Sequence, residues 1–420
     1  MKKIERRNFL KLTSIVGVAL PFTTFSCKSG TRENYTDKLN EILSKPVLIP
    51  TEFDQPLLIE TIELLEINNI FYIRTRTKNG LEGISVTNKK IDTLYPILLK
   101  LVIPYFIGKD ARNIENLIDE VYVYKSNYKM QSLALWCCIA WVEFSVLDLL
   151  GKADKKHISQ LFGNKIREKV PIYVASGNRG TTPEEEIEIL QKKVEQTGAK
   201  AIKFKVGGRM SKNADSITGR SEKLIELSRQ TFGSEYTIQA DANGSYDVKN
   251  AIRVGKLLES INAYLFEEPC RFDHIDETKQ VADALKIPIS GGEQESSEYR
   301  FKNMILNDVV QIVQPDLHYY GGFIRTTRVA RMAEILNKSI TIHISNSNAG
   351  YAEMVNFSSF TPNIGLFQEL KTGMEATSEL FEPSIKVKDG YLNVPKAYGM
   401  GMQHAEEYLK NARVIKDSSL

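Results

Sequence analysis

Residues 237–241 read TIQAD and residues 263–267 read AYLFE, two short runs rich in apolar residues that each end in an acid. The pattern recurs along the chain at intervals of 23 to 27 residues. A strand, a loop and a helix together take about that many residues, and eight such units close into a (β/α)8 barrel with its chemistry at the carboxyl ends of the strands. We therefore predict that the residues ending these runs converge on one mouth of a barrel. They are Asp241, Glu267, Glu293, Asp316, His343 and Glu369.

Eight runs with strand character supply the count that a barrel needs. They are residues 170–175, 201–206, 236–241, 263–267, 287–290, 309–314, 340–344 and 364–369. We predict an α/β fold with a TIM-like (β/α)8 barrel over residues 169–390. Residues 56–168 read as three strands followed by three helices, which predicts an α+β capping domain. The C-terminal segment, 391–420, is expected to return to this cap.

Charge is distributed unevenly along the chain. Residues 1–26 carry five basic residues against Glu5, which more than accounts for the net charge of +3, so the remaining sequence is close to neutral. No basic stripe interleaved with aromatic residues is present, and this argues against a nucleic-acid partner. Residues 28–55 are polar, which predicts a linker.

The N-terminus has the character of a targeting segment. Arg6 and Arg7 precede an uncharged run that is shorter than the roughly 20 apolar residues of a membrane span. Twin arginines before such a run are typical of a twin-arginine export signal. The end of the run resembles a lipoprotein signal with Cys27 as the lipidated residue, although Thr24 stands where leucine is usual. We expect residues 1–27 to direct export to the periplasm or cell envelope, with a lipid anchor as the only contact with the membrane.

Three of the strand-ending residues are carboxylates on successive strands: Asp241, Glu267 and Glu293. Carboxylates this close repel one another at neutral pH unless a divalent cation compensates them. Oxygen ligands with no nearby cysteine or histidine favour a hard cation, and Mg²⁺ is the first choice. A single such acid would be read as an exposed loop residue, but three in register predict one Mg²⁺ site.

Candidate bases occur on other strands. Lys203 and Lys205 alternate with apolar residues, so in a closed barrel both point inward, and a lysine beside a metal cation has a depressed pKa that suits a general base. His343 ends the seventh run, and Asp316 at the matching place of the sixth can orient its imidazole by accepting a hydrogen bond. Glu369 could reach a substrate oxygen, or it could be an isolated acid with no role.

Together these residues resemble the enolase superfamily, and within it the mandelate racemase group of the mandelate racemase/muconate lactonizing enzyme family. The matching pieces are Lys203-Phe-Lys205, Asp241-Ala-Asn243, Phe266-Glu267-Glu268-Pro269, Gly292-Glu293, Gln314-Pro-Asp316 with Gly321-Gly322, His343 and the stretch AWVEFSVLDLLGK at 140–152. They run through most of residues 57–410, and their combination is specific although each piece alone is not.

The resemblance implies that Mg²⁺ binds the substrate carboxylate and stabilises the enediolate formed when the α-proton leaves. Lys205 would abstract the proton from one face, and His343, paired with Asp316, would act from the other. Lys203 would help to neutralise the carboxylate, and Glu369 would hydrogen-bond the enediolate. The residues expected to support the substrate or the metal ligands from behind are Asn243 and Glu268.

Two segments depart from the family pattern. The break in the first cap hairpin, Glu66–Asn69, is short where relatives often carry a longer loop over the site, and Gly83–Asn88 lacks the Gly-Glu that commonly follows this hairpin. Both segments help to set specificity in the family, so no substrate name is carried over from it. A shorter lid would suit a more open site and a larger substrate, and a loop supplied by another subunit would cover the site equally well.

The leading interpretation is Mg²⁺-dependent dehydration of a sugar acid to a 2-keto-3-deoxy acid, a lyase reaction. Racemisation or epimerisation of a 2-hydroxy acid stays open, because the same two bases on opposite faces support this isomerase reaction. An exported lipoprotein that only binds carbohydrate, with a relict site, is the third reading. The expected partner is a small-molecule carboxylate, and self-association into a homo-oligomer stays open.

Overall fold

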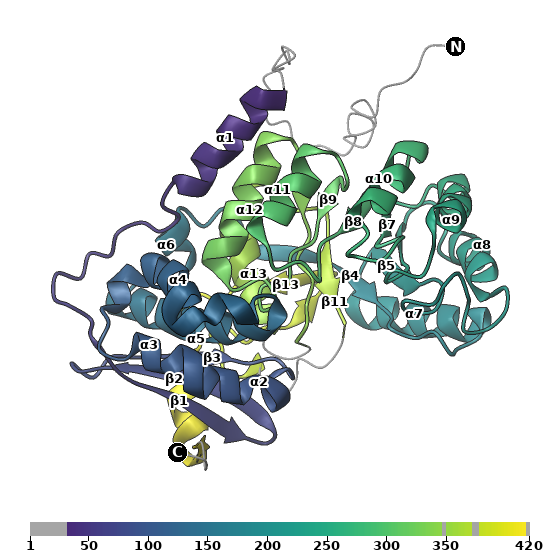
Figure 1. The fold of residues 1–420 in the computed structure, drawn as a ribbon. Helices are drawn as coiled ribbons and strands as arrows, with labels where there is room; N and C mark the ends of the chain where they lie inside the picture. Colours follow the sequence, from purple (N-terminus) through teal and green to yellow (C-terminus); the bar gives the residue numbers. More distant parts are fainter. Residues whose placement is uncertain (1–31, 347–349, 372–377, 417–420) are drawn as a thin grey trace.

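The computed structural model describes residues 32–346, 350–371 and 378–416, so the expected signal segment with Cys27 lies outside the described residues. A capping domain begins with an antiparallel sheet of strand order β14-β1-β2-β3 (Figure 1). These strands are β1 (Ile59–Ile67), β2 (Ile70–Thr77), β3 (Glu82–Val86) and β14 (Arg413–Ile415). The short hairpin break predicted from the sequence is a two-residue turn in which Asn68 and Asn69 have φ of 52° and 60°. Positive φ at both central residues is the geometry of a tight hairpin turn.

Helices follow this sheet in the chain, and the longest of them packs on β2 and β3. They are α2 (Ile91–Ile97), η2 (Leu98–Val102), α3 (Ile103–Phe106), η3 (Ala111–Asn113), α4 (Ile114–Val123), η4 (Tyr124–Met130), α5 (Leu133–Ala153) and α6 (Ser159–Phe162). The first of the three helices expected in the cap is divided into shorter pieces over residues 91–106, because Pro96 and Pro104 lack the amide hydrogen that a continuous helix needs. The apolar helix α5 is long enough to cross a membrane, but it is a core helix here, packed against β2, β3 and α12.

A parallel barrel follows the cap. Its strands are β4 (Lys169–Ala175), β5 (Ala201–Lys205), β6 (Thr237–Asp241), β7 (Leu265–Glu267), β8 (Ile289–Gly291), β9 (Ile312–Val313), β10 (Ser339–Ile340) and β11 (Gln368–Leu370). The strands pair in chain order from β4 to β10, and β11 pairs with β4. A parallel bridge between Ile340 and Ile364, just before β11, closes the ring. The predicted barrel and its eight strands are confirmed.

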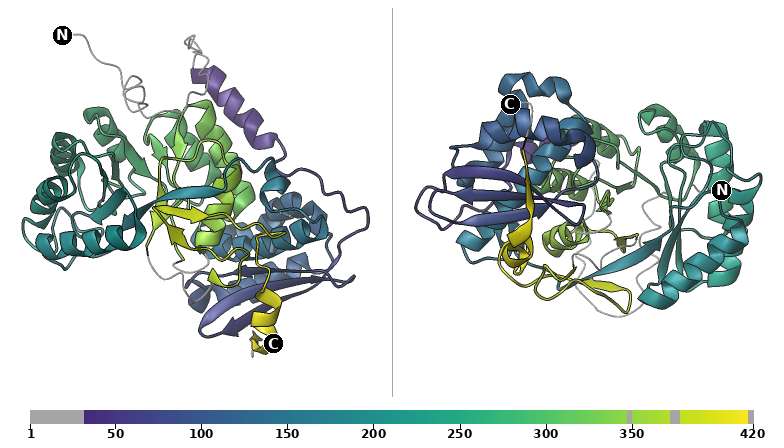
Figure 2. Two further views of the ribbon diagram at one scale, coloured as in Figure 1. Left: turned by 180° about the vertical axis from the view of Figure 1, so that it is seen from behind. Right: turned by 90° about the horizontal axis from the view of Figure 1, so that it is seen from below.

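Helices surround the barrel between the strands (Figure 2). They are α7 (Pro183–Thr197), α8 (Arg220–Phe232), α9 (Val248–Ser260), α10 (Ile275–Ala284), α11 (Glu298–Leu306), α12 (Phe323–Ile335) and α13 (Gly350–Phe360). Local sequence explains their ends: before α7, the Thr182 hydroxyl accepts the amide of Glu185 while the Glu185 carboxylate accepts the amide of Thr182. Gly198, with a φ of 70°, ends the helix in the left-handed conformation that favours glycine.

The cap and the barrel meet where α5 contacts the start of α12. Glu143 of α5 accepts the backbone amides of Phe323 at 2.5 Å and Ile324 at 3.1 Å, which caps the first turn of α12. Gly322 precedes that turn with a φ of 102°, and a Cβ there would meet a Glu143 carboxylate oxygen at 2.2 Å. This close approach explains why glycine suits the second position of the Gly321-Gly322 pair.

The C-terminal segment contacts both domains. Its strands are β12 (Val387–Lys388) and β13 (Tyr391–Asn393), and its helical turns are α15 (Ala405–Tyr408) and η5 (Leu409–Asn411). β13 pairs antiparallel with β4 of the barrel, and β14 then pairs with β1 of the cap. In Figure 2 this yellow segment runs from the barrel to the cap sheet.

Part of the segment predicted to be a linker is instead helical. The helix α1 (Arg32–Ser44) packs on α11 and α12 of the barrel with Leu39 fully buried, so the apolar side of this segment is not free in solvent. The composition of residues 28–55 is polar overall, so it gave no indication of this apolar side. The chain after α1 is held by Glu115 of α4, whose carboxylate accepts the amides of Val47 and Leu48 at 2.9 to 3.1 Å.

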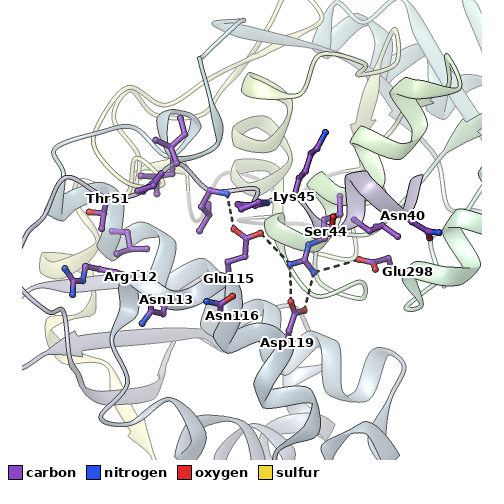
Figure 3. A pocket seen from close by; sticks show the side chains of 18 of the residues that line it. Asn40, Ser44, Lys45, Thr51, Arg112, Asn113, Glu115, Asn116, Asp119 and Glu298 are labelled. Carbon is purple, nitrogen blue, oxygen red and sulfur yellow. Dashed lines mark hydrogen bonds and ion pairs between the residues drawn. The ribbon is translucent and has the colours of Figure 1, made fainter. Parts of the chain in front are cut away.

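A cavity of about 990 Å³ lies beside this segment (Figure 3). Four of its charged side chains are paired with one another: Arg328 approaches Asp119 at 3.2 Å, Glu115 at 3.5 Å and Glu298 at 3.9 Å. None of the six strand-ending residues lines it. The cavity therefore belongs to the junction between α1, the cap and the barrel, and the chemistry must be sought at the barrel mouth.

Candidate active site

Strand register brings the predicted metal ligands together. The parallel pairing of β5 with β6 sets Lys205 beside Asp241, and the pairing of β6 with β7 sets Asp241 beside Glu267. Glu293 follows the end of β8 by two residues. Residues paired across parallel strands project to the same face, so these side chains meet at the carboxyl ends of the strands.

The three carboxylates form one compact cluster. Asp241, Glu267 and Glu293 each offer an oxygen within 4.8 Å of the others, and their side chains are buried. Lys205 Nζ forms an ion pair with Asp241, and Lys203 Nζ lies 2.9 Å from Glu267 Oε2. Both lysines therefore point into the mouth, as the alternation along their strand predicts.

The electrostatics of the cluster suit a divalent cation. Burial raises the pKa of Glu267 to about 7, and the Asp241 charge adds to this rise. Burial also opposes ionisation of Asp241, but Lys205 and Lys203 outweigh it and hold the pKa of Asp241 below its usual range. The buried Glu268 Oε1 has no hydrogen-bond partner among the described residues. Three buried hard oxygen donors with incompletely compensated charge fit Mg²⁺.

The predicted dyad follows the next two strands of the barrel, β9 and β10. His343 Nδ1 is 2.8 Å from Asp316 Oδ2, and the two residues form a parallel bridge beyond β9 and β10. His343 Nε2 is 3.3 Å from Glu293 Oε2, so the imidazole faces the carboxylate cluster. Burial disfavours the charged imidazole, yet the neighbouring Glu293 and the hydrogen bond to Asp316 raise the pKa of His343, although Lys371 opposes them. The dyad can therefore hold and deliver a proton beside the cluster.

Glu369 lies within the same site and is not an isolated acid. Its Oε1 is 3.0 Å from Lys203 Nζ, and its Oε2 accepts the amide of Ile344 at 3.1 Å. Burial opposes its ionisation, but Lys203 and Lys371 together hold the pKa of Glu369 well below its usual range. Lys203 thus bridges Glu267 and Glu369 across the barrel.

Asn243 and Glu268 lie directly behind the cluster. The Asn243 amide hydrogen donates to Asp241 Oδ1 at 2.8 Å, and its side-chain Nδ2 lies 3.5 Å from Glu268 Oε2. Burial raises the pKa of Glu268 well above its usual range, and Glu293 adds to the rise. Arg179, on the loop between β4 and α7, donates to Asn243 Oδ1 at 2.6 Å. The sequence carried no signal for Arg179, because its loop has no recognisable motif.

Three further polar residues lie in the site and were not predicted from the sequence. Tyr173 on β4 has its hydroxyl 2.9 Å from Lys203 Nζ, and Gln314 donates to Glu267 Oε2 at 2.9 Å. Lys371 Nζ is 3.2 Å from His343 Nε2 and 3.3 Å from Glu369 Oε2. Gln314 belongs to the Gln-Pro-Asp motif, and Lys371 follows Glu369 by two residues on the same side of the strand. Both positions were therefore open to prediction from the pattern.

Comparison with known proteins identifies the two domains. Residues 58–163 match the mandelate racemase/muconate lactonizing enzyme N-terminal domain, and residues 165–408 match the enolase C-terminal domain-like family. A solved structure from Roseobacter denitrificans superposes with a TM-score of 0.79 at 29% identity, covering 86% of this chain and 99% of that one. A mandelate racemase/muconate lactonizing protein from Paracoccus denitrificans, complexed with magnesium, has a TM-score of 0.79 at 23% identity, covering 86% and 99%.

Curated relatives cover a similar part of the chain. An arabinonate dehydratase of Saccharolobus solfataricus is 27% identical over 321 residues, which are 76% of this chain and 81% of the relative. A D-galactonate dehydratase of Verminephrobacter eiseniae is 24% identical, covering 71% and 79%. Both domain matches and the barrel geometry agree with the resemblance seen in the motifs. The chain belongs to the mandelate racemase/muconate lactonizing enzyme family of the enolase superfamily.

Proposed function

We propose that the protein dehydrates a sugar acid to a 2-keto-3-deoxy acid, using Mg²⁺ held by Asp241, Glu267 and Glu293. One observation carries the proposal: Lys205 and the His343–Asp316 dyad both adjoin the carboxylate cluster, from β5 and from the segment after β10. A proton acceptor and a proton donor therefore flank the place where a substrate carboxylate would bind. The curated relatives named as arabinonate and galactonate dehydratases support this reaction class.

Each residue has a distinct task in this reaction. A bound Mg²⁺ would coordinate the substrate carboxylate, compensate Asp241 and stabilise the charge that develops when the α-proton leaves. Lys205 takes that proton, and Lys203 contributes positive charge beside Glu267. His343 gives a proton from Nε2 to the departing β-hydroxyl, which leaves as water, while Asp316 holds Nδ1. The resulting enol becomes the 2-keto acid by tautomerisation, in which carbon 3 takes up a proton and the enol hydroxyl loses one.

A screen of acid sugars with Mg²⁺ present tests the proposal. Semicarbazide derivatisation would detect a 2-keto-3-deoxy product, and polarimetry would detect inversion at the α-carbon. We expect product from at least one acid sugar and none in the Glu267→Gln variant. Interconversion of stereoisomers without dehydration would establish the racemase or epimerase instead. Binding without turnover in the presence of Mg²⁺ would favour a carbohydrate-binding protein with a relict site.

We further propose, from the sequence alone, that the protein is exported and lipid-anchored through Cys27. Cell fractionation of an Arg6→Lys/Arg7→Lys variant tests export, because the twin arginines are the recognition element of such a signal. Retention of this variant in the cytoplasm is expected. A Cys27→Ser variant should leave the membrane fraction but still be exported. Unchanged membrane association of that variant would contradict the anchor without affecting the export proposal.

A further inference from the structure

A chain of hydrogen bonds runs from the capping domain to the His343–Asp316 dyad. Asn88, in the cap segment after β3, donates from Nδ2 to Ser345 Oγ at 2.8 Å. Ser345 Oγ donates to Asp316 Oδ1 at 3.1 Å, and Asp316 Oδ2 is 2.8 Å from His343 Nδ1. The chain therefore connects a cap residue to the imidazole through two intermediate groups.

The direction of these hydrogen bonds is fixed by chemistry. Asn88 Oδ1 accepts the amide of Lys90 at 3.1 Å, which leaves its Nδ2 to face Ser345 as a donor. The ionised Asp316 carboxylate can only accept, so the single hydroxyl proton of Ser345 is donated to it while the Ser345 oxygen accepts from Asn88. Each group thus has the role that its neighbour requires.

Asp316 is held on one oxygen so that the other is free for the imidazole. Its Oδ1 accepts the amides of His318 and Tyr319, both at 2.8 Å, in addition to the Ser345 hydroxyl. Its Oδ2 accepts from His343 Nδ1, which directs Nε2 toward the carboxylate cluster. Asn88 is 1% exposed and Asp316 is 0% exposed, and Ser345 between them is partly buried.

A second contact ties the same two segments. Asn346 donates from Nδ2 to the carbonyl oxygen of Thr87 at 3.0 Å. The residues just after His343 are therefore attached to consecutive residues of the cap, Thr87 and Asn88. This cap segment, residues 83–88, is one of the two that depart from the family pattern in sequence. A change in the cap here would be transmitted directly to the dyad.

We propose that Asn88 is a positioning residue for the general acid: through Ser345 it orients Asp316, and thereby His343, so that placement of the cap and competence of the dyad are coupled. The proposal rests on the proposed role of His343 in dehydration. Asn88 and Ser345 act through Asp316 and do not touch the substrate. Their removal should therefore lower kcat and leave KM nearly unchanged.

Two variants break the chain at different links. In Asn88→Asp, the new carboxylate has the same shape but accepts the Ser345 proton, which draws it away from Asp316. Ser345→Ala removes the hydroxyl, and Ser345→Thr restores it. We expect kcat to fall about 10-fold to 100-fold in Asn88→Asp and Ser345→Ala, the effect of losing one hydrogen bond to a charged group. Ser345→Thr should recover most of kcat, and Lys89→Ala, at the exposed neighbour of Asn88, is the matched control.

A spectroscopic readout separates this proposal from the proposed function. The chain has five histidines, so selective ¹⁵N-histidine labelling gives few signals, and the Nδ1–H resonance of His343 is assigned by its loss in His343→Asn. In the resting protein we expect this proton to shift and to exchange faster in Asn88→Asp and Ser345→Ala, with Mg²⁺ affinity unchanged as evidence of a folded site. This measurement holds even if no acid sugar is dehydrated.

Three outcomes would overturn the proposal. An unchanged His343 resonance in both variants would show that the chain does not orient the imidazole. A raised KM with unchanged kcat would make Asn88 a substrate contact. A kcat lowered equally in Ser345→Thr and Ser345→Ala would show that packing, and not the hydroxyl, matters at this position.

Discussion

The two sides of the barrel mouth are held in different ways. On the β5–β8 side, Lys205, Asp241 and Glu267 are fixed by the register of neighbouring strands and by direct ion pairs. On the β9–β11 side, His343 and Asp316 follow their strands in loops, and hydrogen bonds from the cap complete their support. The carboxylate half of the site is therefore built by the barrel alone, whereas the half with the His343–Asp316 dyad depends on two domains.

Loss of a metal ligand should have the largest effect. Glu267→Gln keeps the shape of the side chain and removes one of the charges that attract the cation, so we expect activity to fall by several orders of magnitude. Activity on the substrate found by the screen and Mg²⁺ binding by calorimetry measure this. The exposed Glu222→Gln is the matched control. Full activity after exhaustive chelation would show that the carboxylate cluster does not hold a metal that the reaction needs.

Loss of the proton donor His343, on the other side of the mouth, should have a smaller effect, and this effect should be confined to one step of the reaction. His343→Asn removes proton donation to the β-hydroxyl, and general acid–base assistance is worth about 10²-fold to 10⁴-fold. We expect product formation to fall by that factor while exchange of the α-proton in heavy water persists through Lys205. NMR of the substrate measures both rates, and Asp316→Asn should weaken product formation less. Equal loss of exchange and product would show that the two sides do not divide the reaction.

The carboxylate side should also respond to pH. Because burial raises the pKa of Glu267 to about 7, its proton competes with the cation below that pH. Raising the pH through about 7 removes this proton. Mg²⁺ affinity should therefore rise about tenfold for each pH unit up to about 7 and level off above it. Titration calorimetry in two buffers of different protonation enthalpy would report the proton released. An affinity independent of pH between 5.5 and about 7.5 would contradict this pKa assignment.

The smallest effect is expected at Lys371, the most exposed of the site lysines. Its side chain is 35% exposed, and its Nζ lies 3.2 Å from His343 Nε2, where a substrate oxygen would approach. Lys371→Met should raise KM by about 5-fold to 10-fold, the effect of one hydrogen bond, with a smaller change in kcat. Steady-state kinetics with Lys371→Arg as the charge-preserving control tests this. A higher kcat at unchanged KM would mean that Lys371 acts on His343 and not on the substrate.

The sequence predicted most of the barrel because its signal is local. Six of the eight expected strands have an acid or a histidine at their end or within three residues of it, and the intervals between these six residues match one strand, loop and helix. The helix α1 was missed for a different reason. Its sequence is polar overall, and the burial of Leu39 comes from α11 and α12, which lie far along the chain. Composition therefore pointed to a linker where tertiary packing holds a helix.

The same division applies within the site. The sequence by itself was enough to place the three carboxylates, both lysines and the dyad at one mouth, because the carboxyl ends of parallel strands meet there whatever the loops do. Only the tertiary structure showed that Tyr173 contacts Lys203 and that Asn88 reaches Asp316 through Ser345. Asn88 and Ser345 are 257 residues apart, and a hydrogen bond between them depends on how the cap docks on the barrel. Periodicity along a chain records strand register, but it carries no information on contacts between two separately formed domains.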